Sequence, residues 1–183
     1  IGVRLVGSEM CIRDSPMPDT LMANRVRMLS ALARASGYLG MCGGQALDLD
    51  AEGRRISLAE LEQVHRHKTG ALIECAVTLG ALCKADVEPA TLTALQTYAA
   101  AIGLAFQVQD DILDITGDTA TLGKPQGSDL ALEKSTYPAL LGLDNARELA
   151  RELHDKALTA LQSLPYNTDI LEAFADYIIE RTH

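Results

Sequence analysis

Aromatic residues are scarce in this 183-residue chain, where they make up 4% of the sequence and tryptophan is absent. The sequence is instead rich in alanine and leucine, which favours helices over sheets. Basic residues are also in the minority, with 16 against 25 acidic ones and a formal net charge of −9. Because nucleic-acid backbones recruit Lys and Arg, this balance argues against a nucleic-acid partner. A bound anion would need local lysines or a bridging metal ion.

Cysteines and long apolar runs are also few. The four cysteines, Cys11, Cys42, Cys75 and Cys83, show neither a CxxC nor a Cys/His spacing, so the pattern predicts neither a zinc site nor a disulfide framework. Free thiols are typical of a cytoplasmic protein, and we expect that compartment. No apolar run approaches the ~18 residues that a membrane span requires, so we expect no transmembrane segment.

The first fifteen residues differ from the rest of the chain. Leu5 to Asp14 reads LVGSEMCIRD, which is what one reading frame of a transposase adapter from sequencing libraries encodes. A natural N-terminal strand and loop is the alternative, whereas a signal peptide is not indicated because no basic segment precedes an apolar core. We therefore expect residues 1–15 to be a non-native, adapter-derived segment and residues 16–183 to form the domain.

From Pro16 onward apolar residues recur at three- and four-residue spacing, which predicts an all-α fold of long helices around a buried centre. Ser57 to Glu60 forms a capping box that should start a long helix to about Cys83. Pro89 should start another, to about Ile115. The other predicted helices are 22–35, 44–49, a short one that Pro138 interrupts, 144–164 and 168–181. Residues 117–129 are the only long stretch rich in turn formers.

Three aspartates, Asp110, Asp111 and Asp114, lie near the end of the helix predicted from Pro89. Their spacing should crowd three carboxylates on one side of the helix, with Gln107 one turn earlier on that side. Such like charges destabilise a helix, and in apolar surroundings an uncompensated charge is expensive. A cation should offset them, and oxygen-only ligands favour Mg²⁺, with Mn²⁺ also suitable. An acidic solvent-facing side is the alternative, although such sides usually mix Lys and Glu.

Four ordered motifs resemble the trans-isoprenyl diphosphate synthase (polyprenyl synthetase) family. The segment FQVQDDILD followed by GDTATLGKPQGSD is similar to the family's second aspartate-rich motif. The GQxxD pattern occurs at Gly44 to Asp48, the KT pattern at Lys68-Thr69, and the ending ADYIIERTH is also similar. The resemblance extends from Pro16 to His183. Within the family it is strongest to the bacterial members that make farnesyl diphosphate.

The resemblance implies an enzyme that condenses an allylic diphosphate (dimethylallyl or geranyl) head to tail with isopentenyl diphosphate, giving farnesyl diphosphate and pyrophosphate. It also implies a fold of the isoprenoid-synthase helical-bundle type and a homodimeric parent. The implied metal ligands bridge Mg²⁺ to the allylic diphosphate: Asp110 and Asp114, with Asp111 supporting. The implied diphosphate-binding cations are Lys68, Lys124 and, more weakly, Lys134. The implied catalytic residues are Lys68, Thr69 and Gln107, and Phe106 would pack against isopentenyl diphosphate.

Several of these residues also have plain structural explanations. Lys68 alone would be a solvated helix lysine, and Thr69 could bond back to its own helix. Gln45 and Asp48 suit a structural polar pair that lines the bundle better than a catalytic pair. His65 and His67 are two residues apart, so they point to different helix faces and should not bind a metal.

One family feature has no counterpart in the sequence. The family carries a further aspartate-rich motif on a facing helix, and nothing upstream of Lys68 supplies a second Asp-Asp pair. We therefore expect the C-terminal part of a longer enzyme, inactive by itself. Two alternatives stay open: a non-catalytic subunit of a heteromeric prenyltransferase, and a class I terpene cyclase, which typically carries an Asn/Ser/Glu motif in place of DDxxD.

Overall fold

The structure, a computed structural model, describes residues 18–117 and 134–181, and these form helices without a strand. The all-α prediction is therefore confirmed. The elements are η1 (Asp19–Leu21), α2 (Met22–Ser36), α3 (Met41–Ala51), α4 (Leu58–His65), the π-helical turn η2 (Arg66–Gly70), α5 (Ala71–Ala81), α6 (Pro89–Thr116), α9 (Tyr137–Leu141), α10 (Leu143–Gln162) and α11 (Asp169–Glu180).

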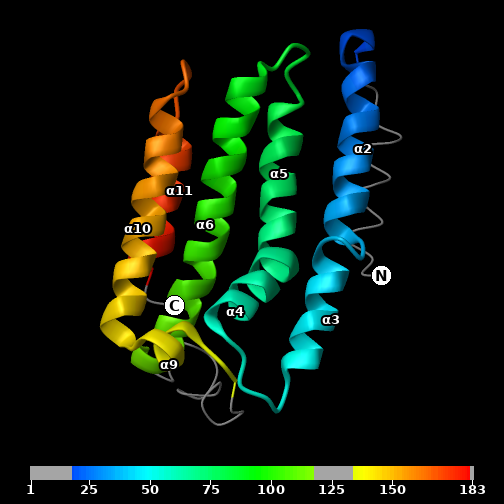
Figure 1. Ribbon diagram of the computed structural model, residues 1–183. Coiled ribbons are helices and arrows are strands. Elements are labelled where there is room, and N and C mark those ends of the chain that lie inside the picture. The colour runs from blue at the N-terminus through cyan, green and yellow to red at the C-terminus, as the bar shows by residue number, and fades with distance from the viewer. Residues whose placement is uncertain (1–17, 118–133, 182–183) are drawn as a thin grey trace.

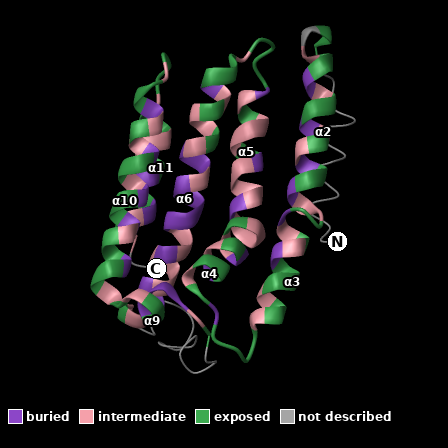
Figure 2. Cartoon of the chain, viewed as in Figure 1, coloured by how far each residue is buried: buried purple, intermediate pink, exposed green. Residues whose placement is uncertain are grey.

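The helix α6 lies at the centre of the row of helices in Figure 1. It packs against α5 on one side and against α10 and α11 on the other, while α2 and α3 lie beyond α5. Small side chains in the middle of α6 let these neighbours approach closely: Ala99, Ala101, Gly103 and Ala105 are all buried. The result is a continuous apolar core between α6 and α10, whose buried residues are purple on the helices in Figure 2.

The helix α10 shows why the helical pattern was readable from the sequence. Its buried residues recur at three- and four-residue spacing, so one stripe faces α6 while the other sides stay in solvent. The stripe consists of Ala146, Ala150, Leu153, Ala157 and Leu161.

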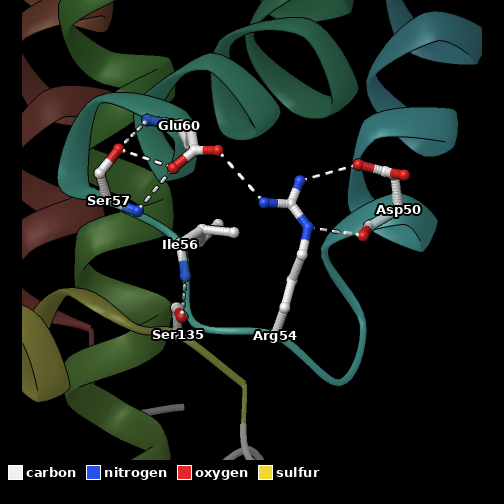
Figure 3. Close-up of polar contacts among 6 residues, drawn as sticks. All are labelled: Asp50, Arg54, Ile56, Ser57, Glu60 and Ser135. Carbon is white, nitrogen blue, oxygen red and sulfur yellow. Dashed lines mark hydrogen bonds and ion pairs between the residues drawn. The ribbon is translucent and has the colours of Figure 1, made fainter.

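Two predicted helix starts are confirmed in detail. Ser57 caps α4, because its hydroxyl accepts a hydrogen bond from the Glu60 N–H while the Glu60 carboxylate accepts one from the Ser57 N–H (Figure 3). Pro89 occupies the first turn of α6, where its missing N–H costs nothing. Most other predicted helix boundaries agree with the structure to within two residues.

Two predictions about elements are wrong, and a third is incomplete. The short helix expected over 44–49 is longer, Met41–Ala51. The helix expected from Ser57 to about Cys83 does extend from Leu58 to Ala81, but it contains the π-helical turn η2 between α4 and α5. Pro138 does not interrupt its helix; it lies in the first turn of α9, a position that needs no N–H donor.

Two predictions about the composition can also be compared with the structure. Cys42, Cys75 and Cys83 are free thiols, as expected. Over the described ranges, no helix is both long and apolar enough to cross a membrane. Residues 1–15 lie outside the described residues, so their proposed foreign origin stays a prediction.

Candidate active site

One face of α6 brings the sequence motifs together. Gly103, Gln107, Asp110 and Asp114 follow each other at four-, three- and four-residue spacing, which places them on the same side of a helix. At Gly103 this side meets η2, because an added Cβ there would lie 3.4 Å from the Gly70 Cα atom. The turn that carries the KT motif therefore rests on the face of α6 that continues into the aspartates.

The carboxylate of Asp110 makes two contacts at this face. Its Oδ2 atom accepts a hydrogen bond from the Gln107 amide at 3.2 Å, which confirms the prediction that Gln107 lies on the aspartate side. Its Oδ1 atom accepts a short hydrogen bond from the Arg181 guanidinium. The carboxylate is still 42% exposed, so Asp110 combines partial charge compensation with access to solvent.

Arg181, which follows directly after α11, lies over Phe106, which precedes Asp110 by four residues on α6. Its guanidinium carbon lies 4.3 Å from the centre of the Phe106 ring, and its Nη2 atom also donates to the Phe106 carbonyl oxygen at 3.2 Å. A guanidinium stacked on an aromatic face and hydrogen-bonded at its edge is held in a defined orientation. The side chain is only 10% exposed, so Arg181 is a built-in counterion for Asp110.

The other two aspartates of the motif turn to different surroundings. The Oδ2 atom of Asp111 accepts a hydrogen bond from the Tyr137 backbone N–H at 2.9 Å, at the start of α9. Asp114 is 2% exposed and lies in the buried part of α6. Over the described ranges, no three acidic, histidine or cysteine side chains are grouped so that they could hold a metal ion. The three aspartates thus do not form one such group, since Asp110 faces Gln107 and Arg181 whereas Asp111 faces the start of α9.

The lysine of the KT motif lies on η2 and pairs with α3. The Lys68 ammonium donates to the Asp48 carboxylate at 2.5 Å, and both side chains are partly exposed. Gln45 is exposed, so the expected polar pair of Gln45 and Asp48 is wrong and Lys68 is the partner of Asp48. Thr69, the next residue of η2, is half-buried. A π-helical turn at this place is notable because such turns often occur at functional sites.

The first glycine of the GQxxD pattern explains how close α3 comes to η2. A Cβ atom added to Gly44 would lie 2.6 Å from the Lys68 Cα atom and 2.7 Å from the His67 carbonyl carbon, and closer still to the Lys68 nitrogen. Because no side chain fits in this space, the backbones of α3 and η2 touch. The contact places Asp48, one turn further along α3, within reach of Lys68.

The two histidines near Lys68 have separate environments. Burial lowers the pKa of His65 to about 4, with Asp48 and Lys68 exerting smaller and opposing effects, so the ring is neutral at pH 7. Its ring lies 5.5 Å from the ring of Tyr137, measured between centroids. The Nδ1 atom of His67 instead lies 2.8 Å from the Gln63 carbonyl oxygen.

Two of the predicted diphosphate-binding lysines follow the aspartates in the chain. Lys124 lies outside the described residues. Lys134 is exposed and comes directly before the segment 135–137, which is fixed to the rest of the fold. The prediction for Lys134 thus depends on what holds that segment in place.

Sequence reasoning missed Arg181 and misassigned Asp48. Arg181 is 71 residues away from Asp110 in the chain, and no local pattern predicts a contact over that separation. A signal for Asp48 did exist, since the GQxxD and KT patterns each place one charge of opposite sign near a glycine. Pairing those charges requires knowing that α3 packs on η2.

The donor atoms of the aspartate motif suit a hard divalent cation. Carboxylate oxygens are the ligands that Mg²⁺ prefers, and Mg²⁺ is usually held by one or two carboxylates together with water and substrate phosphates. Asp110 and Asp114 lie one turn apart on the same face of α6, and Asp110 is open to solvent. The exposed carboxylate of Asp110 therefore fits a share of such a coordination shell, whereas Asp114, at 2% exposure, would have to become accessible before it could join.

Comparison with known proteins assigns the family. A family model described as polyprenyl synthetase matches residues 7–176, so the chain belongs to the polyprenyl synthetase family. The match begins inside the segment 1–15, so the boundary that we expect after residue 15 stays a prediction.

Curated and solved relatives agree with this family. The farnesyl diphosphate synthase of Escherichia coli K12 is 59% identical over 173 residues, which cover 93% of this chain and 58% of that protein. The structure of geranylgeranyl pyrophosphate synthetase from Pyrococcus horikoshii matches with a TM-score of 0.81 and 27% identity, covering 93% of this chain and 62% of that one.

A further relative was solved with ligands. The geranyltransferase of Helicobacter pylori, complexed with magnesium and isoprenyl diphosphate, matches with a TM-score of 0.78 and 29% identity over 95% of this chain and 56% of that one. The chain thus spans somewhat more than half the length of the relatives it matches.

Proposed function

We propose that the protein to which this chain belongs is a prenyltransferase of the farnesyl diphosphate synthase type. It would condense dimethylallyl or geranyl diphosphate head to tail with isopentenyl diphosphate, releasing pyrophosphate. One observation carries this proposal: η2 packs on the same face of α6 that also presents Gln107 and Asp110. Family membership supports chain elongation over a terpene cyclase or a non-catalytic subunit.

In this proposal Asp110 and Asp114 hold Mg²⁺, and Mn²⁺ would suit the same oxygens. A metal ion held there would supply positive charge that offsets the charge developing on the departing pyrophosphate, and so would favour ionisation of the allylic C–O bond. Asp110 suits this role because its carboxylate is partly exposed and because the Gln107 amide fixes its orientation. Asp111, which the sequence places in the same motif, instead accepts a hydrogen bond from the backbone of α9.

The remaining roles fall on residues that surround the same face of α6. Lys68 would exchange part of its contact with Asp48 for the diphosphate, with Lys134 and Lys124 as further cations. Thr69 and Gln107 would stabilise positive charge near the reacting carbons. Phe106 would pack against isopentenyl diphosphate through the part of its ring that Arg181 leaves uncovered. We also propose a homodimeric, cytoplasmic parent.

The test is Asp110→Ala in the enzyme extended to the length of its relatives. Loss of transition-state stabilisation by one such group typically costs ~3–4 kcal/mol, so we expect kcat at saturating Mg²⁺ to fall by roughly 10²–10³. The metal-free melting temperature is measured beside it, to separate catalysis from folding. A kcat close to that of the unchanged enzyme would contradict the proposal.

A second assay concerns the 183-residue chain itself. A single aspartate motif supplies one or two carboxylates, and the family's condensation uses a second motif, so we expect no turnover of geranyl and isopentenyl diphosphate by this chain. Measured condensation by the chain alone would show that the described residues suffice.

A further inference from the structure

The segment after Lys134 leads into α9, and the backbone N–H groups in the first turn of that helix all have hydrogen-bond acceptors. The N–H groups at the start of a helix have no partner within it, so they need other acceptors. Pro138 has no N–H, and the Ala139 N–H donates to the Thr136 hydroxyl at 3.3 Å. The donor that is left is the Tyr137 N–H, and its acceptor is the Asp111 carboxylate at 2.9 Å.

This contact is difficult to give up. Tyr137 has no exposed surface, so its N–H would lose its partner in a place that water does not reach. A buried donor without an acceptor carries its full desolvation cost, and a hydrogen bond to a charged acceptor is stronger than a neutral one. The Asp111 oxygen that faces α9 is therefore committed to the backbone.

Two further contacts fix the same segment to the lysine side of the site, which consists of η2 with Lys68 and the neighbouring helices α3 and α4. The Ile56 N–H, just before α4, donates to the Ser135 hydroxyl at 3.2 Å, as Figure 3 shows. The Tyr137 ring packs against His65 at the end of α4, directly before the turn that carries Lys68. Residues 135–137 thus connect α6, α4 and the loop that precedes α4.

We infer that Asp111 is a positioning residue that anchors Lys134 beside the aspartate motif, and that it is not a metal ligand. The consequence for Lys134 rests on the proposed function, since that lysine matters only if a diphosphate binds here. Asp110 and Asp111 are neighbours in sequence but have different contacts. The Asp110 carboxylate faces Gln107 and solvent, whereas the Asp111 carboxylate binds the N-terminus of α9.

The experiment compares two replacements of Asp111. Asp111→Ala removes the acceptor, so in the 183-residue chain the Tyr137 amide should exchange with deuterium roughly tenfold faster or more. Asp111→Asn keeps a carbonyl oxygen of the same reach and should retain protection to within about threefold. In case the alanine variant does not fold, Asp111→Ser, whose side chain is too short to reach Tyr137, should show the same loss of protection.

The metal arm uses Mn²⁺ with inorganic pyrophosphate and the enzyme extended to the length of its relatives. We expect Asp111→Asn to bind Mn²⁺ within about threefold of the unchanged enzyme, and Asp110→Asn to bind it roughly tenfold more weakly or worse, because an amide is a poorer ligand for a hard cation than a carboxylate.

The outcomes separate this inference from the proposed function. Unchanged Tyr137 exchange in Asp111→Ala would overturn the anchoring role. Mn²⁺ binding that Asp111→Asn weakens as much as Asp110→Asn does would make Asp111 a ligand and also overturn it. If Asp110→Asn leaves Mn²⁺ affinity unchanged, the proposed metal site fails, while the exchange of Tyr137 still decides whether Asp111 is an anchor.

Discussion

The two sides of the candidate site are held in place by different means. On the lysine side, the backbones of α3 and η2 touch at Gly44, and this contact sets the distance between Asp48 and Lys68. On the aspartate side, the carboxylates are oriented by hydrogen bonds from residues distant in the chain: Asp110 accepts from the Arg181 guanidinium and Asp111 accepts from the Tyr137 backbone N–H.

The difference predicts where the site tolerates change. A backbone contact cannot relax without moving a whole helix, so substitutions on the lysine side should act through the fold. On the aspartate side, the contact between the Asp110 and Arg181 side chains can be exchanged for a bound cation at modest cost, so substitutions of Asp110 should act mainly on binding. Asp111 is the exception on this side, because its carboxylate holds a buried backbone N–H.

The largest effect should come from Gly44→Ala. The new methyl group would meet the Lys68 and His67 backbone at distances that no folded chain accepts, so α3 must separate from η2. We expect a loss of at least about 4 kcal/mol in the free energy of unfolding, measured by urea denaturation.

Gly80→Ala is the matched control, since a Cβ atom there meets nothing within 4 Å on α5. Alanine is the better helix former, so this variant should be neutral or more stable by up to about 1 kcal/mol. Equal destabilisation by both variants would mean that the close backbone contact at Gly44 is not what matters.

The next effect concerns pH and His65, whose pKa falls from 6.5 to about 4 on folding. Because His65 is harder to protonate in the folded chain than in the unfolded chain, acid favours unfolding. The contribution of His65 to the free energy of unfolding is therefore fully present above pH 6.5 and is lost as the pH falls toward 4. Between pH 7 and pH 5 this loss should be roughly 2 kcal/mol.

Urea denaturation of His65→Gln at the two pH values tests this effect, because glutamine does not titrate. The variant should lose about 2 kcal/mol less than the unchanged chain over the same interval. An identical pH dependence in both proteins would show that His65 is not buried in its neutral form.

Arg181→Ala should have a smaller effect on stability. It removes the stacking on Phe106 and the partner of a half-exposed carboxylate, which together contribute about 1–2 kcal/mol. Arg181→Lys keeps the charge but not the planar guanidinium, so it should restore only part of the loss. Metal-free Asp110→Ala should also be slightly less stable than the unchanged chain, because it loses the ion pair with Arg181 and the relief of like-charge repulsion offsets only part of that loss.

The smallest effect should come from Ser135→Ala, which removes one hydroxyl acceptor at the edge of the fold. The net value of such a hydrogen bond is about 1 kcal/mol or less. Hydrogen exchange at the Ile56 amide should increase, while exchange at the Tyr137 amide should stay close to that of the unchanged chain. Equal loss of protection at both amides would show that the two anchors of residues 135–137 are not independent.

The helices were predictable from the sequence because their causes are local. The capping box at Ser57, the proline at the start of α6 and the apolar stripe of α10 each act within a few residues. The π-helical turn was not predictable, because residues in a π turn and in an α turn look alike and the packing of η2 on α3 and α6 is a tertiary contact.

The residues of the site were predictable from the sequence, but most of the contacts between them and other elements were not. The spacing of Gln107 and Asp110 gave a correct contact because both lie on one helix. The partners of Lys68, Asp110 and Asp111 lie outside the helix or turn that carries each residue, 20, 71 and 26 residues away, so only the packing of the fold reveals them.

The central claim is that the lysine side and the aspartate side form one site for a diphosphate and its metal. The most direct measurement is the binding of inorganic pyrophosphate, with and without Mg²⁺, to the enzyme extended to the length of its relatives and to its Lys68→Ala and Asp110→Asn variants. Lys156→Ala, at an exposed position of α10, is the matched control. The account predicts Mg²⁺-dependent binding that each site variant weakens roughly tenfold or more and the control leaves unchanged. Binding that is independent of Mg²⁺, or that neither site variant weakens, would contradict it.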